Sequence, residues 1–396
     1  MIGMYNPPNP GGKPIHVTEI SRRLSLEHQV TVVTSGWKRR RFIDGRVTVY
    51  EESSALGIPV PHLKFLRAIR LRKGADLYHC HGPYDAAVGL IDRSRPLVST
   101  VHGLSSREIG VRRGRSPSGL SFSASTVMER AAFDRSDALI CVHRELAEII
   151  RTENPGVAAR TVVIPNGVDA ERFRPDPAAR AEMRRRLRVG PEEKLVCCMK
   201  TLRKDSFETA IEAVAEIDDP RVRLLLPSRD PSIDLSAIAA SRGVADRCII
   251  VPDISPDDTP TFYAAADVVI IPYVKREYGL HENAAAPPGN RSVAEMTSDG
   301  FAACTSLGVL EAFSCGLPTV IATPEAAVRM DGTDIGALVP AWDPKAMARA
   351  VVALASDGNL SGRLGSNARD FVLRSLTWDR IVSRTLDVYR TAAGRR

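Results

Sequence analysis

The chain has few aromatic residues and no long hydrophobic run. Phe, Trp and Tyr make up only 5% of the 396 residues, and the longest apolar stretches, such as residues 264–272, are much shorter than a bilayer-spanning helix. Pro7 and Pro8 follow the first residues closely, without the apolar core of a signal peptide. We therefore expect a cytoplasmic protein with no transmembrane segment.

The seven cysteines lack the spacing of metal ligands or redox pairs. Cys197 and Cys198 are adjacent within an apolar, strand-like run, which indicates reduced thiols buried in a core. The sequence also contains no tandem repeat with a period of 20–50 residues, so it does not predict a solenoid or a propeller.

Length and composition predict a globular protein of two domains. The chain is 44% hydrophobic and carries a net charge of +7. Residues 1–176 hold 26 Lys and Arg against 18 Asp and Glu, whereas residues 177–396 hold 28 against 29. A positive surplus in one half is typical of proteins with an anionic partner, such as a phospholipid surface, a phosphorylated acceptor or nucleic acid.

Two basic stretches, residues 38–41 and 63–73, account for much of this surplus. They could contact an anionic membrane at its surface or form a solvated face, and we favour the solvated face. Nucleic acid is not an expected partner, because aromatic residues do not alternate with the charges in a stacking pattern.

The first half alternates strand and helix patterns, which predicts a parallel sheet covered on both faces. A Pro/Gly loop, residues 6–14, follows a short strand at residues 1–5, and residues 37–41 are expected to be a loop. The other expected strands are 30–34, 47–50, 76–79, 97–101, 138–142 and 161–164, and the expected helices are 17–26, 63–73, 124–135 and 145–151.

A second series of the same kind follows residue 194. Its expected strands are 195–199, 222–227, 248–251, 268–271 and 318–322, with helices at 208–216, 235–241 and 259–265. We therefore predict two Rossmann-like, doubly wound parallel-sheet domains, residues 1–170 and 171–376, that face a cleft. The amphipathic helix within about residues 377–396 can pack on either of them, including back on the first.

Residues 305–320 predict a helix with an anion site at its start. Small residues and Gly308 precede an apolar helical pattern, and Gly316 and Pro318 end it. The first backbone N–H groups of such a helix have no intrahelical partner and can bind phosphate. Leu307, Leu310, Glu311 and Ser314 are three and four residues apart, so they share one face.

Five motifs in order along nearly the whole chain resemble those of family 4 glycosyltransferases of the GT-B fold. Pro165-Asn-Gly-Val-Asp169 resembles the family's inter-domain turn, and Leu310–Pro318 its donor-site helix. The others are a glycine loop ending in Gly11 and Gly12, strand ends at His79-Cys-His-Gly82 and Val101-His-Gly103, and the strand at residues 264–272.

This resemblance implies a retaining transfer of a sugar from a nucleotide diphosphate sugar, with the acceptor on the first domain and the donor on the second. The sequence does not identify the acceptor, the base or the sugar. No redox cofactor or metal is implied. His102 is then the residue beside the reacting sugar, while His79 and His81 are weaker candidates without an acidic partner at metal-ligand spacing.

The resemblance also assigns donor-binding residues. Gly11 and Gly12 would let the backbone approach the donor, amides around Leu307 and Gly308 would hold phosphate, and Glu311 would accept hydrogen bonds from the ribose. Lys200 aligns with the family's diphosphate-binding arginine, although a lysine supplies charge without a bidentate fork. The family lysine falls at Asp205, so the adjacent Lys204 and Arg203 are its candidate replacements.

One departure concerns the donor sugar. Family members usually carry a second glutamate eight residues before the position of Glu311, and this chain has Ala303 there. Glu277 or Glu295 could supply the missing carboxylate. This departure keeps open a nucleotide-sugar-binding subunit that has lost catalysis, whereas an epimerase of the same architecture is disfavoured by the Pro165–Asp169 turn and the Glu311 helix.

Overall fold

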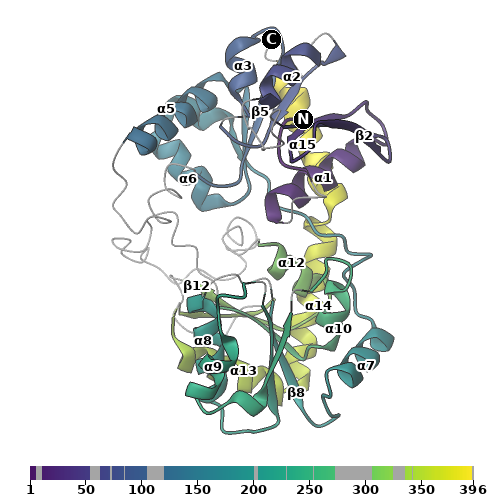
Figure 1. The fold of residues 1–396 in the computed structure, drawn as a ribbon, viewed down its shortest axis with the longest axis vertical. Helices are drawn as coiled ribbons and strands as arrows, with labels where there is room; N and C mark the ends of the chain where they lie inside the picture. The colour runs from purple at the N-terminus through teal and green to yellow at the C-terminus, as the bar shows by residue number, and fades with distance from the viewer. Residues whose placement is uncertain are drawn as a thin grey trace. The chain divides into compact units, whose positions relative to one another are not determined.

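The computed structural model divides the chain into two compact units. It describes residues 1–5, 11–53, 63–71, 74–83, 85–104, 120–199, 204–228, 230–252, 254–272, 306–323, 335–340 and 342–394. Among these, the first unit contains the residues up to Gly167 and those from Trp378 onward, and the second contains the residues between Val168 and Thr377. Each unit has its own sheet (Figure 1).

The first unit is built on two groups of strands that Ile2 connects. One group has the order β1-β3-β2 and the other the order β4-β5-β6-β7. Ile2 forms parallel bridges to Val33 of β1 and to Cys80 of β4. The strand order therefore proceeds outward from Ile2 on both sides, through β1 on one side and β4 on the other. The carboxyl ends of these two strands form a topological switch point, where ligands bind in such folds. The strands are β1 (Thr31–Ser35), β2 (Arg40–Asp44), β3 (Val47–Glu52), β4 (Tyr78–Cys80), β5 (Leu97–Val101), β6 (Ala138–Cys141) and β7 (Thr161–Val163).

The last helix of the chain belongs to this first unit. It packs on α1 and on the end of β5, and Figure 1 shows it in yellow beside the purple N-terminal helix. Arg23 of α1 pairs with Asp379 at 2.9 Å across this contact. The helices are α1 (Gly12–Leu24), α2 (Leu63–Leu71), α3 (Ala87–Ile91), α5 (Leu120–Arg135), α6 (Arg144–Glu153), the 3-10 helix η2 (Pro155–Arg160) and α15 (Trp378–Gly394).

The second unit has one parallel sheet of order β10-β9-β8-β11-β12-β13. Strands β8 and β11 are neighbours, and the chain proceeds outward from each of them, so the switch point of this sheet lies at their carboxyl ends. The strands are β8 (Lys194–Cys198), β9 (Val222–Ser228), β10 (Cys248–Pro252), β11 (Val268–Ile271), β12 (Thr319–Thr323) and β13 (Ala337–Pro340).

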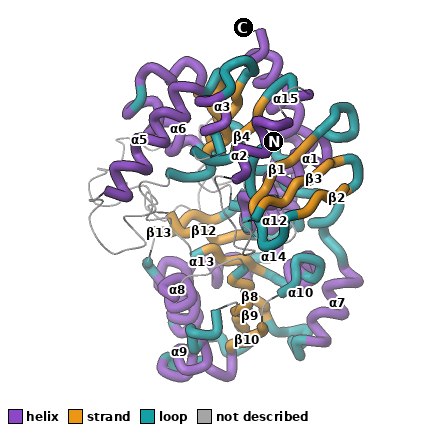
Figure 2. Tube along the Cα trace, turned by 45° about the horizontal axis from the view of Figure 1, so that its top comes forward, coloured by secondary structure: helices purple, strands orange, loops and turns teal. Residues whose placement is uncertain are grey.

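Helices cover this sheet and complete a large core. Helices α8 and α13 pack on each other and on the strands, and α12 packs against α14 (Figure 2). Buried Val196, Phe207, Leu224 and Val351 belong to one apolar cluster. The helices are α7 (Pro177–Arg186), α8 (Lys204–Ala215), α9 (Leu235–Ser241), the 3-10 helix η3 (Ala245–Arg247), α10 (Thr259–Ala265), α12 (Leu307–Ser314), α13 (Pro344–Ser356) and α14 (Gly358–Ser375).

The predicted α/β class with parallel sheets is confirmed in both units. The cysteines among the described residues carry free thiols, as expected, and five of the six are buried. No described helix has both the length and the apolar character needed to cross a membrane.

The prediction of a loop at residues 37–41 was wrong for its last two residues, because strand β2 begins at Arg40. This edge strand pairs antiparallel with β3, and the Arg40 guanidinium lies 2.6 Å from Glu51 and 4.8 Å from the Phe42 ring. Ladder hydrogen bonds and these contacts outweigh the local loop signal of four consecutive basic residues.

Helix α1 also begins earlier than expected, at Gly12 instead of Val17. Pro14 is compatible with this start, because a proline in the first turn of a helix gives up no intrahelical hydrogen bond. Three elements near the end of the chain, β13, α13 and α14, were not predicted as such.

Candidate functional sites in the two units

Three histidines gather at the carboxyl edge of the first unit's sheet. His81 follows β4, His102 follows β5, and His16 lies on the second turn of α1. One ring nitrogen of each lies within 4.8 Å of the others. Parallel strands end at one edge, and α1, which follows the segment of Ile2 that bridges β1 and β4, starts near it, so topology brings these three side chains together.

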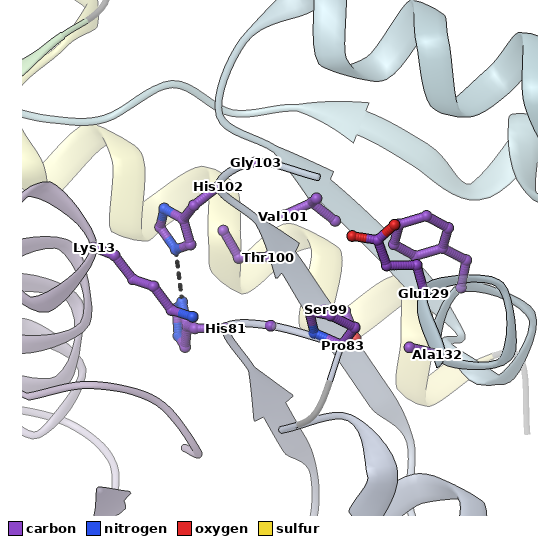
Figure 3. A pocket seen from close by; sticks show the side chains of 12 residues that line it. Lys13, His81, Pro83, Ser99, Thr100, Val101, His102, Gly103, Glu129 and Ala132 are labelled. Carbon is purple, nitrogen blue, oxygen red and sulfur yellow. Dashed lines mark hydrogen bonds between the residues drawn. The ribbon is translucent and has the colours of Figure 1, made fainter. Parts of the chain in front are cut away.

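The His81 and His102 rings contact each other directly. Nδ1 of His81 lies 3.2 Å from Nε2 of His102, as the dashed line in Figure 3 shows, and the rings are stacked with centroids 5.5 Å apart. His16 approaches His102 edge-on, at 4.8 Å between centroids. His16 and His81 are each only 1% exposed, whereas His102 is half-buried and adjoins a cavity.

A cavity of about 120 Å³ opens beside this cluster. Figure 3 shows Lys13, His81 and His102 on one side and Glu129 of α5 on the other, with Thr100 and the end of β5 between them. Glu129 is 4% exposed, and Lys13 lies 3.9 Å from Asp85. A carboxylate and an ammonium on opposite walls suit a small polyol that carries several hydroxyl groups.

His79 has a structural role. Its Nδ1 lies 2.6 Å from the Tyr389 hydroxyl, and its Nε2 lies 2.7 Å from Oγ1 of Thr100. Both ring nitrogens are therefore occupied, and the ring ties β4 to α15 and β5. The sequence pattern had singled out His79 but not His16, whose position on α1 gave no local signal for a place beside His102.

Burial keeps these imidazoles neutral. It lowers the pKa of His16 to about 4, although the hydrogen bond with Asn166 opposes the shift. Burial also lowers the pKa of His79 and His81 well below the ordinary value, and the neighbouring histidines add to this effect. At neutral pH their ring nitrogens are therefore available as hydrogen-bond acceptors or as ligands.

The start of α1 has the backbone geometry expected of a close-approach loop. Gly11 at the N-cap has a φ of 129°, a conformation that side chains other than glycine rarely adopt. The helix begins at Gly12, and its N-cap residue Gly11 has no side chain with which to cap it. The N–H groups of its first turn therefore face the carboxyl edge of the sheet without a side-chain cap.

In the second unit, α12 presents a buried carboxylate near an uncapped N-terminus. The helix begins at Leu307, and the side chain of Ser306 makes no capping hydrogen bond. Glu311 is 5% exposed and Gly308 is also buried, whereas Leu307 is half-buried. Burial raises the pKa of Tyr263 well above its ordinary value, and the charge of Glu311 adds to this shift. Glu311 is thus no surface charge.

Close packing determines the position of α12. Ser314 Oγ donates to the Phe173 carbonyl oxygen at 2.5 Å, and the Tyr263 hydroxyl donates to the Gly308 carbonyl oxygen at 3.1 Å. The helix ends at Ser314, and Gly316, which was predicted to stop it, follows with a φ of 68°. A methyl group on Gly365 of α14 would lie 2.0 Å from the Gly316 carbonyl oxygen, so α14 can approach only because residue 365 is glycine.

The remaining donor-site candidates are only partly described. Lys204 is the first residue of α8, its side chain is 64% exposed, and it pairs with Glu208 at 3.5 Å. Asp205 is half-buried in the same turn. Lys200, Arg203, Glu277, Glu295 and Ala303 lie outside the described residues.

The turn at residues 165–169 connects the first unit to the residues that follow it. Asn166 Oδ1 accepts a hydrogen bond from Nδ1 of His16 at 3.0 Å. A side chain on Gly167 would lie 2.7 Å from the Trp378 ring, so glycine is required there. Asp169 accepts hydrogen bonds from the backbone N–H groups of Glu171 and Arg172.

These features match a known family. The model of glycosyltransferase family 4 matches residues 10–172, which include the start of α1, both histidine-bearing strand ends and the turn just described. The predicted resemblance is thereby confirmed for this part of the chain.

Curated relatives extend the similarity to the second unit. A GDP-mannose-dependent alpha-(1-6)-phosphatidylinositol monomannoside mannosyltransferase of Mycolicibacterium smegmatis is 26% identical over 391 residues, covering 94% of this chain and 93% of the relative. The protein of the same name from Mycobacterium tuberculosis is 28% identical, but that match covers 59% of this chain and only 57% of the relative. A D-inositol 3-phosphate glycosyltransferase of Xylanimonas cellulosilytica is 28% identical over 81% of this chain and 73% of the relative.

Solved glycosyltransferases share the fold of this chain, which is the GT-B fold. The sucrose-phosphate synthase of Thermosynechococcus elongatus has a TM-score of 0.72 at 19% identity, covering all of this chain and 96% of the other. Anabaena HepE in complex with UDP has a TM-score of 0.69 at 18% identity, covering 98% and 99%. These similarities establish the fold.

Proposed function

We propose that this protein is a retaining glycosyltransferase that moves a sugar from a nucleotide diphosphate sugar to an acceptor hydroxyl. In this reaction the bond between the anomeric carbon and the diphosphate breaks, a bond to the acceptor oxygen forms, and the hydroxyl proton and the nucleoside diphosphate leave. The observation that carries the proposal is buried Glu311, just inside a helix whose first amides receive no hydrogen bond from the Ser306 side chain.

The second unit supplies the donor site in this proposal. Helix α12 precedes β12, which is parallel to its neighbour β11, so its N-terminus is at the carboxyl edge of the sheet. The partial positive charge of that N-terminus stabilises the diphosphate as negative charge develops on it. Glu311 accepts hydrogen bonds from the ribose hydroxyls, and Lys200, Arg203 and Lys204 are candidates to supply positive charge.

The first unit supplies the acceptor site and His102. The cavity beside His102 has polar groups on opposite walls, which matches an acceptor with several hydroxyl groups. Two kinds of curated relative are named for inositol-based acceptors, a phosphatidylinositol mannoside and D-inositol 3-phosphate. We therefore infer a phosphorylated polyol, free or on a lipid, as the acceptor class. Gly11 and Gly12 let the backbone approach the donor.

Contact with an anionic membrane is not needed for a free acceptor, and the ion pairs of the two basic stretches give such contact little support. Arg40 pairs with Glu51 at 2.6 Å, and Arg67 pairs with Glu52 at 2.5 Å. Both carboxylates are buried, so much of the positive charge of this surface is compensated within the unit. This supports a solvated face as the role of the two basic stretches.

Purified protein should be incubated with UDP-, GDP- and ADP-sugars, each with inositol phosphates and with phosphatidylinositol vesicles, in the presence of EDTA. Formation of a glycosylated acceptor with retained anomeric configuration supports the proposal, and activity in EDTA supports metal-independent transfer. Binding of a nucleotide sugar without turnover on any acceptor would instead favour a binding subunit that has lost catalysis, the alternative suggested by Ala303 and Asp205. Product from the donor alone would indicate an epimerase.

A further inference from the structure

The histidine cluster of the first unit has features that sugar transfer does not explain. A histidine beside the reacting sugar needs no second and third imidazole within 4.8 Å. Nε2 of His16 is buried, and no described residue offers it a hydrogen-bond partner. Buried ring nitrogens without partners are costly in a protein core unless a ligand occupies them.

The hydrogen bond of His16 fixes which of its nitrogens can bind a ligand. Because Oδ1 of Asn166 can only accept, the proton of His16 is on Nδ1, which lies 3.0 Å away. Nε2 therefore carries a lone pair. An imidazole whose other nitrogen donates to an oxygen acceptor is the arrangement that orients metal-bound histidines.

The spacing of the nitrogens suits a small tetrahedral ion. With Zn–N bonds of about 2.0–2.1 Å, two ligand nitrogens on one zinc ion are roughly 3.3–3.4 Å apart. Nδ1 of His81 and Nε2 of His102 are already 3.2 Å apart. The three ligand nitrogens lie within 4.8 Å of one another, so closing the set requires a movement of at most about 1.5 Å, within reach of small ring rotations.

The ligand set also favours a transition metal over magnesium or calcium. Three imidazoles suit Zn²⁺, whereas Mg²⁺ and Ca²⁺ prefer oxygen ligands. Because His102 adjoins the cavity, a fourth position on the ion can be taken by water or by an acceptor hydroxyl. The Lys13 ammonium opposes a cation here, but Asp85, 3.9 Å away, partly compensates its charge.

We propose that His16, His81 and His102 form a binding site for Zn²⁺, and that the bound ion inhibits sugar transfer. The second part rests on the proposed function, because a metal on Nε2 of His102 prevents that nitrogen from contacting the donor sugar. In the metal-free protein one proton lies between Nδ1 of His81 and Nε2 of His102. When the ion binds, that proton moves to the other nitrogen of its own ring, so both imidazoles stay neutral and each offers a lone pair to the ion. Sugar transfer and metal binding both need Nε2 of His102, so they exclude each other.

Metal binding can be measured without any activity. Untagged full-length protein, stripped with EDTA and dialysed, is titrated with Zn²⁺ against a chromophoric chelator and with Co²⁺ by visible absorption. We expect one Zn²⁺ per chain and the intense absorption of tetrahedral Co²⁺. His16→Ala, His81→Ala and His102→Ala should each weaken Zn²⁺ binding by at least about 100-fold, and Asn166→Ala by about 10-fold.

His28→Ala is the matched control, because His28 is an exposed histidine of the same unit outside the cluster. It should bind Zn²⁺ like the unaltered protein. Circular dichroism of each metal-free variant identifies any that fail to fold, and half-buried His102 gives the variant with the smallest folding risk. Equal Zn²⁺ affinity in His102→Ala and in the unaltered protein would overturn the site, as would the absence of binding at about 100 μM Zn²⁺.

Transfer assays then separate the two proposals. Inhibition that titrates with the measured Zn²⁺ occupancy, and that EDTA reverses, supports both. Full activity with the site occupied would overturn the inhibition and the role of His102 in transfer, while the metal site itself would stand on the titrations. Transfer in EDTA with no Zn²⁺ binding would overturn the metal site and leave the glycosyltransferase proposal intact.

Discussion

The two units present their candidate sites in different ways. In the second unit the site is one contiguous element, α12, with Glu311 four residues after its start. In the first unit it is assembled from α1 and the ends of β4 and β5, whose histidines are 21 to 86 residues apart in sequence. A contiguous site depends on local helix geometry, whereas an assembled site depends on sheet topology. This difference predicts different consequences of substitution.

The largest expected effect is on turnover, from the assembled site. If His102 contacts the reacting sugar, His102→Ala should lower kcat by about 10²–10³-fold with little change in donor affinity, because its contribution is strongest in the transition state. Steady-state kinetics in EDTA and donor binding by calorimetry measure the two quantities. His28→Ala is the control. A loss confined to donor affinity would instead assign His102 to donor binding, the role that is proposed for Glu311.

Glu311→Ala should act on binding. Losing hydrogen bonds to a buried carboxylate costs about 1.5–3 kcal/mol, which corresponds to roughly 10- to 100-fold weaker donor binding. Calorimetry with the nucleoside diphosphate measures this loss. Glu216→Ala, at an exposed position of the same unit, should bind normally. Unchanged affinity in Glu311→Ala would remove α12 from the donor site.

Gly365→Ala tests whether packing against α14 determines the position of α12. The added methyl group would lie 2.0 Å from the Gly316 carbonyl oxygen, and the resulting shift should cost about 2 kcal/mol. Urea unfolding measures this loss. Gly362→Ala lies three residues earlier in the same helix, in open space, and should stabilise the protein by about 0.5–1 kcal/mol. Equal effects of the two substitutions would contradict the close approach.

Asp267→Asn gives the smallest effect and concerns the second unit only. Burial raises the pKa of this carboxyl group, but the Leu195 N–H and the guanidinium groups of Arg180 and Arg184 outweigh it, so the pKa is below its ordinary value of 3.8. The carboxylate therefore stabilises the fold above pH 3.8, and this contribution is lost as pH falls through the folded-state pKa.

The substitution should cost about 1–2 kcal/mol at pH 7. The difference between variant and unaltered protein, followed by urea unfolding at several pH values, should shrink below about pH 4. Asp218→Asn, at an exposed position of the same unit, is the control. A difference that stays constant down to pH 3 would exclude a stabilising carboxylate at position 267.

The part of this architecture that follows local rules could be predicted from the sequence. Strands β5 and β11 and helices α9 and α10 have the expected limits, because apolar period and flanking turn residues mark them directly. The end of α12 just before Gly316 was predictable for the same reason. Strand β2 was not, because its pairing with β3 and the contacts of Arg40 are long-range interactions.

The candidate sites likewise differ in whether local or long-range interactions determine them. The amino-acid sequence alone determined α12, the position of Glu311 within it, and the order of motifs that indicated the family, because these depend on neighbours within a few residues. Only the tertiary structure decided that His79 is a structural residue and that His16 joins His81 and His102. Such groupings arise where parallel strands end at one edge, and sequence spacing carries no record of which strands are neighbours.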